Sequence, residues 1–551
     1  MADLSFDVVI IGGGNKGLVT AMYLTKYGKM NVGIFEDRHE LGGGWCQEEP
    51  VPGFIANPCS MDHASFYHIP VYWDFPEWET YGAKYAYTEI TTGCIFIEDD
   101  SCLLQYAAFD DVDPTQERTA KEIARFSEKD AETYLKLWEK SEKYWDPAIR
   151  EWMFTPAKPF SEPDALDKLI QNPDSGIDPA WLYMSPLQVY HDVFEDPHLR
   201  HAFARINQSL AIQNDMAAAG LMALMMIFQF WPRSCWVKGS SHSLAHAAHR
   251  IILENGGKVF TNCEVKKILL ENGRAKGIRL ADGSEVEAKK AVVTSLDPYQ
   301  VCFELLGKEN VDYRIANRIK NLERDWVALM WYTWALKERP HFKAESWNPD
   351  VWKSMWVALG DMDVSTFKVE SSERKMYKWP SKLNLGYAYH GATIIDSGDH
   401  LIAPPEINFT ILTEQFVVPA WSLSDEEWKV KEKQHAEEVI ELFKKYAPNM
   451  SWNNVIGYLP VTPRYTANMA KNYAPAGNWC IIDNIPSQSG RMRPIPELAG
   501  NRWPGIKGLY CTGSAWHPYG CAHSPQAYNC YKVMAEDFGL IKTWEKEGRP
   551  F

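Results

Sequence analysis

The sequence predicts an α/β protein in which a Rossmann-like nucleotide-binding domain is assembled from separated segments and a sheet-and-helix (α+β) domain completes the chain. Three observations predict this fold. A β-branched run near the N-terminus enters a glycine cluster, a helix–hairpin–strand pattern lies mid-chain, and a buried strand enters a further glycine turn near the end. At 551 residues the chain is too long for one small core. With 46% hydrophobic and 23% charged residues, its composition is that of an ordinary globular protein.

The first predicted element is a buried strand over residues 6–11, because the run is β-branched and continuous. It enters a turn in which Gly12, Gly14 and Gly17 fit the pattern G-x-G-x-x-G. The first glycine permits a tight turn, the second lets backbone approach a pyrophosphate, and the third allows close packing of helix on strand. Asn15 lies inside the turn, where a helix start offers N–H groups to an anion. The alternative is a glycine turn without a ligand.

A second strand, predicted over residues 32–35, ends in Glu36, nineteen residues after Gly17. An acid at about this distance is expected to bind the ribose hydroxyl groups of a dinucleotide. Residues 37–45 then contain another glycine cluster. A nicotinamide-dependent dehydrogenase would usually continue into its next helix at this point, so the second cluster indicates a different kind of dinucleotide protein.

The middle of the chain is predicted to be largely helical at first. Residues 113–152 are charged, with apolar side chains at helical spacing, which predicts an amphipathic helical insertion. Residues 155–179 are rich in Pro, Asp and Ser and predict a loop. Residues 188–230 predict two helices, of which the second is apolar almost all round. Such a helix is buried in the core, lines a cavity or contacts a membrane, but its apolar run, 216–228, is shorter than the roughly 20 residues that span a bilayer.

A helix–hairpin–strand unit is predicted over residues 238–295. Three strands, at 325–334, 382–389 and 406–418, and an exposed helix at 426–446 then predict a domain built on a sheet. The chain is rich in aromatic residues, with 23 Trp, 26 Tyr and 23 Phe. Trp and Tyr at strand spacing belong either to a core or to the wall of an apolar ligand cavity.

The last predicted strand, residues 508–514, enters a glycine turn that leads to a helix over 526–538. His517, Tyr519 and His523 cluster in this turn, and we predict them as catalytic residues that handle a proton. The alternative is that these side chains only form structural hydrogen bonds.

The glycine clusters, the mid-chain unit and the closing turn resemble, in order and spacing, the FAD-dependent phytoene desaturase (carotenoid desaturase/isomerase-like) family within the amine oxidase superfamily. The resemblance covers about the first seventy residues, Trp236–Pro298, and Pro463 to the end. It implies non-covalently bound FAD, with the backbone of Val265 at the adenine and the last helix directed at the flavin. Departures lie in the closing turn, where the family usually has glycines and a proline.

The resemblance and the glycine motifs together give the expected FAD-binding residues. These are Gly12, Gly14, Asn15, Gly17, Glu36, Asp37, Arg38, Gly43, Gly44, Trp45, Asn57, Val265, Gly513, Ser514, Cys521 and Ala522. The FAD-binding domain is predicted at residues 1–110, 232–310 and 470–551, and the substrate-binding domain, with its helical insertion, at 111–231 and 311–469.

The expected activity is FAD-dependent removal of a hydride from a C–H bond of an apolar alkene, terpenoid, carotenoid or alicyclic substrate. This covers dehydrogenation, desaturation and allylic hydroxylation. The alternatives are a flavin-dependent isomerase or hydratase without net redox change, an amine oxidase, and a lipid-binding escort resembling the GDP dissociation inhibitors.

Charge and cysteine usage narrow the partners. A net charge of −15 argues against nucleic acid as a partner. Eleven cysteines without a C-x-x-C pair, and an N-terminus without signal-peptide features, predict a cytoplasmic protein. Any peripheral membrane contact is expected from residues 216–230. No metal-ligand spacing, nucleophile elbow or Walker loop occurs, so no metal is predicted. The electron acceptor and the oligomeric state are not indicated.

Overall fold

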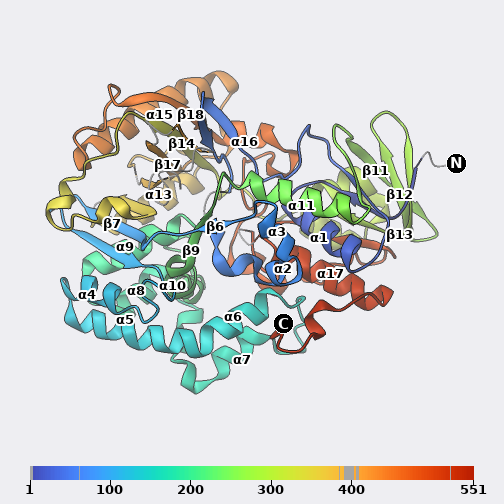
Figure 1. The fold of residues 1–551 in the computed structure, drawn as a ribbon, viewed down its shortest axis with the longest axis horizontal. Coiled ribbons are helices and arrows are strands. Elements are labelled where there is room, and N and C mark those ends of the chain that lie inside the picture. Colours follow the sequence, from blue (N-terminus) through green and yellow to red (C-terminus); the bar gives the residue numbers. More distant parts are fainter. Residues whose placement is uncertain are drawn as a thin grey trace.

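A seven-stranded, mostly parallel sheet forms the nucleotide-binding half of the protein. The computed structural model describes residues 4–60, 63–360, 362–383, 385–389, 402–404, 409–520 and 523–551. The strand order is β10-β2-β1-β13-β12-β11, and β19 pairs with β13. The strands are β1 (Leu4–Ile11), β2 (Val32–Phe35), β10 (Lys258–Phe260), β11 (Val265–Glu271), β12 (Arg274–Leu280), β13 (Glu285–Thr294) and β19 (Leu509–Cys511). Segments from both ends and the middle of the chain therefore share one sheet, which confirms the predicted fold class (Figure 1).

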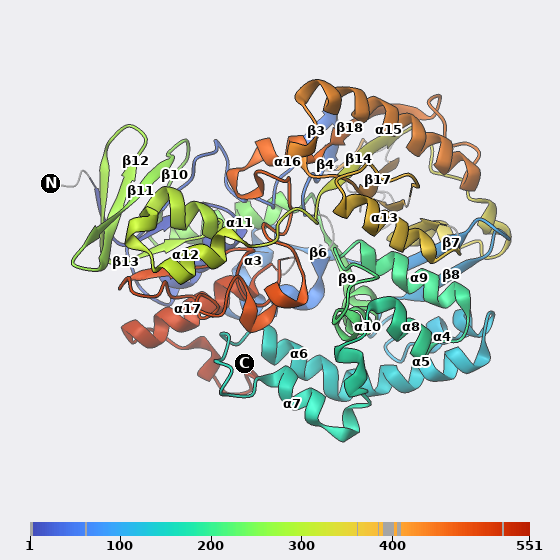
Figure 2. The same cartoon turned by 180° about the vertical axis from the view of Figure 1, so that it is seen from behind.

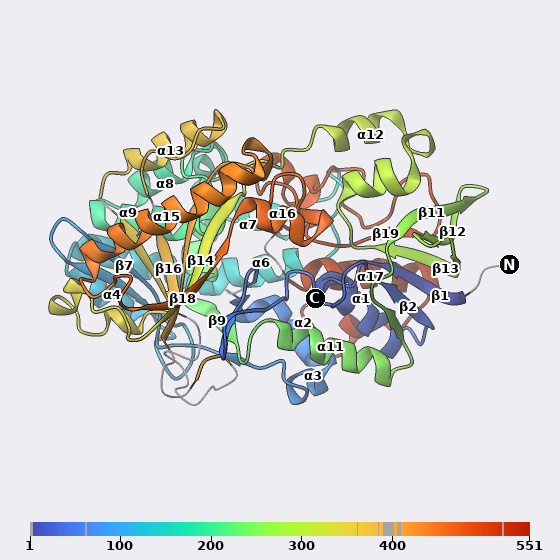
Figure 3. The same ribbon diagram turned by 90° about the horizontal axis from the view of Figure 1, so that it is seen from above.

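Helices cover both faces of this sheet, so its central strands are buried on both sides. The apolar stretch of β1 is fully buried from Val8 to Ile10, as expected of a parallel strand with a layer on each side. Helix α1 (Asn15–Lys26) packs against α11 (His242–Glu254) and α17 (Pro525–Phe538). Helix α12 (Tyr313–Lys320) lies on the other side of the sheet in Figure 3.

A second seven-stranded sheet organises the other half, in the order β18-β14-β17-β16-β15-β7-β8. Its strands are β7 (Ile90–Phe96), β8 (Cys102–Tyr106), β14 (Leu329–Leu336), β15 (Trp356–Gly360), β16 (Gly386–Tyr389), β17 (Phe409–Phe416) and β18 (Val455–Val461). The three predicted strands of this half are present as β14, β16 and β17. Strands β7 and β8 pair within this second sheet. Residues 90–106 therefore belong to this half of the protein, whereas the prediction placed them in the FAD-binding domain with the rest of residues 1–110.

Most helices of the middle segment lie beside the second sheet, whereas those at residues 146–171 lie near the C-terminus (Figure 2). The helices of this segment are α4 (Glu117–Ala124), α5 (Glu128–Lys140), α6 (Asp146–Met153), α7 (Ala165–Gln171), α8 (Pro186–Val193), α9 (Pro197–Gln208) and α10 (Gly220–Gln229). The predicted helical insertion is confirmed by α4 to α6. The loop predicted at 155–179 contains α7, because Asp164 and Asp167 form a capping box that starts a helix there.

The apolar helix α10 is buried in the core, which decides among the three alternatives that its sequence left open. It begins at Gly220, where a Cβ atom would lie 2.4 Å from Cγ2 of Val189 on α8, so the two helices pack closely at that point. Its buried position leaves almost no face for a membrane surface. In the part of the chain that the structure describes, no helix is long and apolar enough to cross a bilayer.

Short strands lie between the two large sheets and bring the N-terminal segment into the middle of the molecule. Strands β5 (His63–Ala64) and β6 (Tyr85–Ala86) both pair with β9 (Ser234–Val237). The remaining elements are β3 (Glu48–Val51), β4 (Phe54–Ala56), α2 (Ile69–Asp74), α3 (Pro76–Thr80), α13 (Ser365–Lys375), α15 (Asp425–Tyr446) and α16 (Pro463–Met469). Helix α15 confirms the predicted exposed helix, and Ser424 caps its start.

Candidate functional site

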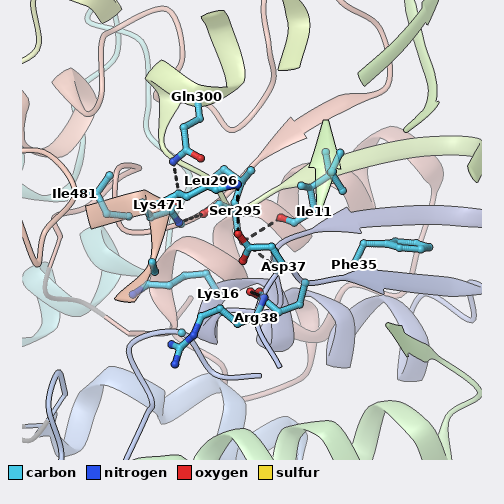
Figure 4. Close-up of a pocket in the computed structure, with 18 of the residues that line it drawn as sticks. Ile11, Lys16, Phe35, Asp37, Arg38, Ser295, Leu296, Gln300, Lys471 and Ile481 are labelled. Carbon is cyan, nitrogen blue, oxygen red and sulfur yellow. Dashed lines mark hydrogen bonds and ion pairs between the residues drawn. The ribbon is translucent and has the colours of Figure 1, made fainter. Parts of the chain in front are cut away.

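A cavity of about 390 Å³ lies at the carboxyl end of β1, where the glycine turn leads into α1. Its walls come from the N-terminal, middle and C-terminal segments of the nucleotide-binding half, and Figure 4 shows ten of its side chains by name. The carboxyl edge of a doubly wound parallel sheet is where such folds bind dinucleotides. This position makes the cavity the candidate cofactor site.

The two glycine clusters lie against each other at the wall of this cavity. The N–H of Asn15 donates to the carbonyl oxygen of Gly42 at 3.0 Å, and the N–H of Gly42 donates to Gly13 at 2.9 Å. A Cβ atom on Gly43, whose φ is +57°, would lie 3.0 Å from Cα of Gly14. Side chains would therefore fill the space that the glycines leave for a close-lying pyrophosphate, and this cradle fits FAD.

The carboxyl group of Glu36, directly after β2, lies at the wall of the cavity. It accepts the N–H of Gly13 at 2.6 Å and the N–H of Arg38 at 3.0 Å. Burial raises the pKa of Glu36 to about 7. A carboxylate has about four acceptor positions, so two remain for the hydroxyl groups of a ribose.

Basic side chains at the cavity suit the negative charge of a pyrophosphate. Lys16, Arg38, Lys266 and Lys471 contribute to its wall, and three of them are labelled in Figure 4. The guanidinium of Arg38 pairs with Glu40 at 2.6 Å, and the ammonium group of Lys471 lies 3.7 Å from Asp37. The Lys16 ammonium group is buried and donates to Oγ of Ser514 at 3.0 Å. The first turn of α1 is thereby tied to the closing motif of the chain.

Most of the predicted FAD-binding residues line this cavity. They are Gly12, Gly14, Asn15, Glu36, Asp37, Arg38, Gly43, Gly44, Val265, Gly513 and Ser514. Gly17 lies behind the turn, where a Cβ atom would be 2.2 Å from the carbonyl oxygen of Gly12. Asn57 is buried and accepts the N–H and hydroxyl of Ser241. Cys521 and Ala522 lie outside the described residues.

Several lining residues were not predicted from the sequence. They are Lys16, Ser295, Leu296, Gln300, Lys471, Asn472 and Tyr473, together with other side chains of the same segments. Lys16 could have been found, because a lysine inside a glycine turn is a natural anion contact. The others come from loops whose sequences contain no motif.

A second cavity, of about 140 Å³, adjoins the first and shares Asn15, Lys16, Gly44, Tyr473 and Ser514 with it. Its wall is largely aromatic, with contributions from β14, β15 and β17 of the second sheet. The aromatic lining residues are Tyr67, Phe230, Trp331, Trp356, Phe416, Tyr473 and Trp479. The wall also includes polar groups, among them Lys16, Glu414 and His523. A chamber with several aromatic walls beside a dinucleotide cavity is a suitable place for a largely apolar substrate.

Both interpretations of the aromatic strand residues are correct, each for different positions. Trp331 on β14 faces the second cavity. Trp334 on the same strand is fully buried, and its indole N–H donates to the hydroxyl of Thr413 at 2.8 Å. Successive side chains of a strand point to opposite faces, so residues three apart lie on different sides.

The structure separates the three residues predicted to handle a proton. His523 lines the second cavity, and the indole N–H of Trp45 donates to its Nδ1 at 3.1 Å. Tyr519 is not among the residues that line either cavity, and its hydroxyl lies 3.0 Å from that of Tyr67, which lines the second cavity. His517 lines neither cavity; it is buried, and its Nε2 lies 2.9 Å from the carbonyl oxygen of Trp152. Burial lowers the pKa of His517.

One carboxylate also reaches the second cavity, and the sequence pattern did not indicate it. Glu414, on β17, is the one acid among the described residues that line this chamber. The buried guanidinium of Arg205 interacts electrostatically with Glu414, and burial lowers the pKa of that guanidinium to about 10. The same guanidinium interacts more strongly with Glu370, so Glu414 shares this buried cation with a second acid.

Comparisons with known proteins agree with this geometry. Residues 10–75 match the model of the NAD(P)-binding Rossmann-like domain, and residues 101–303 match that of flavin-containing amine oxidoreductases. A limonene dehydrogenase polypeptide of Castellaniella defragrans is 26% identical, over 98% of this chain and 96% of its own. A 4,4'-diapophytoene desaturase of a Methylomonas species is 22% identical over 52% of this chain and 53% of its own.

Solved structures show the same fold. An oxidoreductase from Methanosarcina mazei has a TM-score of 0.57 and 16% identity, with 97% of this chain and all of that chain covered. Putrescine oxidase bound to putrescine has a TM-score of 0.56 and 16% identity, with 97% of this chain and 99% of that chain covered.

Proposed function

Because this chain is a phytoene desaturase-like member of the flavin-containing amine oxidase superfamily and an FAD-dependent oxidoreductase, we propose that it dehydrogenates a terpenoid, carotenoid or alicyclic alkene. The observation that carries the proposal is the aromatic cavity, which shares five residues with the cofactor cavity. Relatives named for limonene and for carotenoid precursors support an apolar, unsaturated substrate.

The glycine cradle, Glu36 and the basic residues of the first cavity would hold FAD, which when bound would supply the acceptor for a hydride. The residues of the second cavity would bind the substrate and keep water away from it. The aromatic walls of this cavity exclude water and pack against an apolar substrate. Their ring faces also attract the electron-poor carbon that forms as a hydride leaves.

The partnered state of Glu414 favours an alkene over an amine as the substrate. An amine oxidase binds its substrate through a charged or polar nitrogen, and an acid among aromatic rings suits such a group. Here Lys16 already lines the same chamber, and the buried Arg205 also interacts electrostatically with Glu414. A further cation in this chamber is therefore disfavoured.

Under anaerobic conditions a terpenoid alkene should bleach the flavin of the holoenzyme, whereas primary amines and hydroxy acids should not. Absorbance near the flavin maximum, followed by stopped flow, measures the half-reaction, and product analysis by mass spectrometry identifies the new double bond or alcohol. Rapid bleaching by an amine would replace the proposal with an amine oxidase. Conversion of an alkene without bleaching would replace it with an isomerase or hydratase.

Among the three predicted proton-handling residues, His523→Asn should slow this half-reaction most, because only His523 lines the cavity. A positioned proton-transfer group is typically worth about 10²–10⁴-fold in rate. His517→Asn serves as the matched control, since its ring contacts Trp152 away from both cavities. Equal rates of bleaching in both variants and the unmodified enzyme would remove His523 from the reaction.

A further inference from the structure

Three histidines from distant parts of the chain meet beside the aromatic cavity, and we propose that His63, His68 and His523 bind one divalent transition-metal ion such as Zn²⁺ or Fe²⁺. All three are buried, and one ring nitrogen of each lies within 4.8 Å of the others. No other group of three potential ligands comes this close within the described residues. Imidazole nitrogen is a preferred ligand of these metals.

The three rings are brought together by three different elements. His63 begins β5, which pairs with β9 between the two large sheets; His68 precedes α2, and His523 lies just before α17. The rings of His63 and His523 are stacked, with centroids 4.3 Å apart, and the ring of His68 lies 5.6 Å from that of His523. The spacing of these histidines in the sequence does not predict such a site, because they are up to 460 residues apart.

Two of the rings are oriented for metal binding by neighbours. Nδ1 of His63 lies 3.1 Å from the hydroxyl of Tyr85, and Nδ1 of His68 is hydrogen bonded to the hydroxyl of Ser524. Metal-ligating histidines usually bond a second group through the nitrogen that does not touch the metal. The other nitrogen of His68, Nε2, is buried and has no hydrogen-bond partner, which is costly unless a ligand satisfies it.

His523 is held differently. The indole N–H of Trp45 donates to its Nδ1, so the proton of the neutral, metal-free ring lies on Nε2. An ion that binds Nε2 requires the tautomer in which the proton has moved to Nδ1, and the hydrogen bond from Trp45 to Nδ1 is then lost. The hydrogen bond from Trp45 therefore opposes metal binding. Replacing Trp45 with a residue that has no N–H group tests directly whether His523 is a metal ligand.

The distances fit an ion after a small contraction. Three nitrogens up to 4.8 Å apart surround a centre about 2.8 Å from each. Zinc–imidazole bonds are about 2.0–2.1 Å, so each nitrogen must move inward by less than about 1 Å. Because the metal lies in the plane of each ring it binds, one of the two stacked rings, His63 or His523, must also turn. Oγ of Ser60 lies 3.5 Å from Nε2 of His63 and from both nitrogens of His523, and Ser60 lines the aromatic cavity. The fourth ligand position is thus available to water or to a substrate oxygen on the cavity side.

The test measures metal content and needs no substrate. Holoenzyme stripped with a chelator is dialysed against Zn²⁺, and bound zinc is counted by inductively coupled plasma mass spectrometry together with the FAD content. We expect one zinc per chain, reduced at least tenfold in His63→Gln and His68→Gln. His246→Gln is the matched control, because this histidine lies on α11 outside the cluster, and it should keep its zinc. Trp45→Phe should bind zinc more tightly.

Fewer than about 0.1 zinc per chain in the unmodified protein would overturn the proposal. Full zinc in both His63→Gln and His68→Gln would also overturn it, since the metal would then be adventitious and lie elsewhere. If a variant loses FAD or fails to fold, X-ray absorption of the zinc-loaded unmodified protein decides instead. Three imidazole scatterers support the site, and oxygen ligands alone contradict it. A failure here leaves the dehydrogenase proposal untouched, because that proposal rests on the FAD half-reaction.

Discussion

Gly17→Val should weaken the binding of FAD. In the structure a Cβ atom at this position would lie 2.2 Å from the carbonyl oxygen of Gly12, well inside any permitted contact. Helix α1 must then move away from β1, and the turn that faces the pyrophosphate moves with it. Overpacking of this kind costs about 1–3 kcal/mol, which corresponds to a loss in FAD affinity of roughly 5–150-fold. Titration of the FAD-free protein, followed by flavin fluorescence, measures the affinity.

Gly500→Ala is the matched control for that variant. No atom lies within 4 Å of the Cβ that it would add, and its backbone is not in a region that requires glycine. It should bind FAD as the unmodified protein does. Normal FAD affinity in Gly17→Val would mean that close packing of α1 on β1 is not needed to form the cofactor site.

Glu36→Ala should weaken FAD binding by about 10²–10⁴-fold. The carboxylate lines the first cavity and has acceptor positions left for two ribose hydroxyl groups. Hydrogen bonds to a charged group contribute about 1.5–3 kcal/mol each, so loss of two such bonds accounts for this range. The same fluorescence titration measures it, and an unchanged dissociation constant would contradict the placement of the ribose at Glu36.

The pH dependence of FAD binding provides an independent check on the same residue. Burial raises the pKa of Glu36 to about 7 in the protein without ligand. Ionised carboxylate is the stronger acceptor, so FAD binding favours the ionised form. The dissociation constant should therefore rise as pH falls below about 7, approaching tenfold per pH unit. Glu36→Gln cannot ionise and should show a flat profile over that range; a parallel pH profile in this variant would assign the dependence to another group.

The predictions that the structure confirms concern features with a local physical cause. A continuous β-branched run can only be buried on both faces, so the strand at residues 6–11 was predictable, and β1 has this environment. Ser424 and Glu427 form the capping box that starts α15, and that signal is contained in four residues. The glycine turn is local in the same sense, because its pattern reflects backbone sterics over six residues.

The features that the sequence did not predict depend on contacts between distant segments. Ser295, Gln300 and Asn472 line the cofactor cavity only because β13 and a C-terminal loop reach the same edge of the sheet as β1. Helix α7 replaced a predicted loop, since composition rich in Pro, Asp and Ser describes both turns and helix caps.

Backbone sterics and hydrophobic periodicity therefore predicted the dinucleotide fold, the glycine turn at Gly12–Gly17 and the acid at Glu36 from the amino-acid order alone. Tertiary structure decided which of His517, Tyr519 and His523 lines the second cavity, and it decided that His523 contacts Trp45, a residue 478 positions away. The physical reason is that local rules act over a few residues, whereas a cavity wall is set by how whole sheets and helices pack. That packing depends on the sum of many weak, non-directional apolar contacts, and these have no signature in any short stretch of sequence.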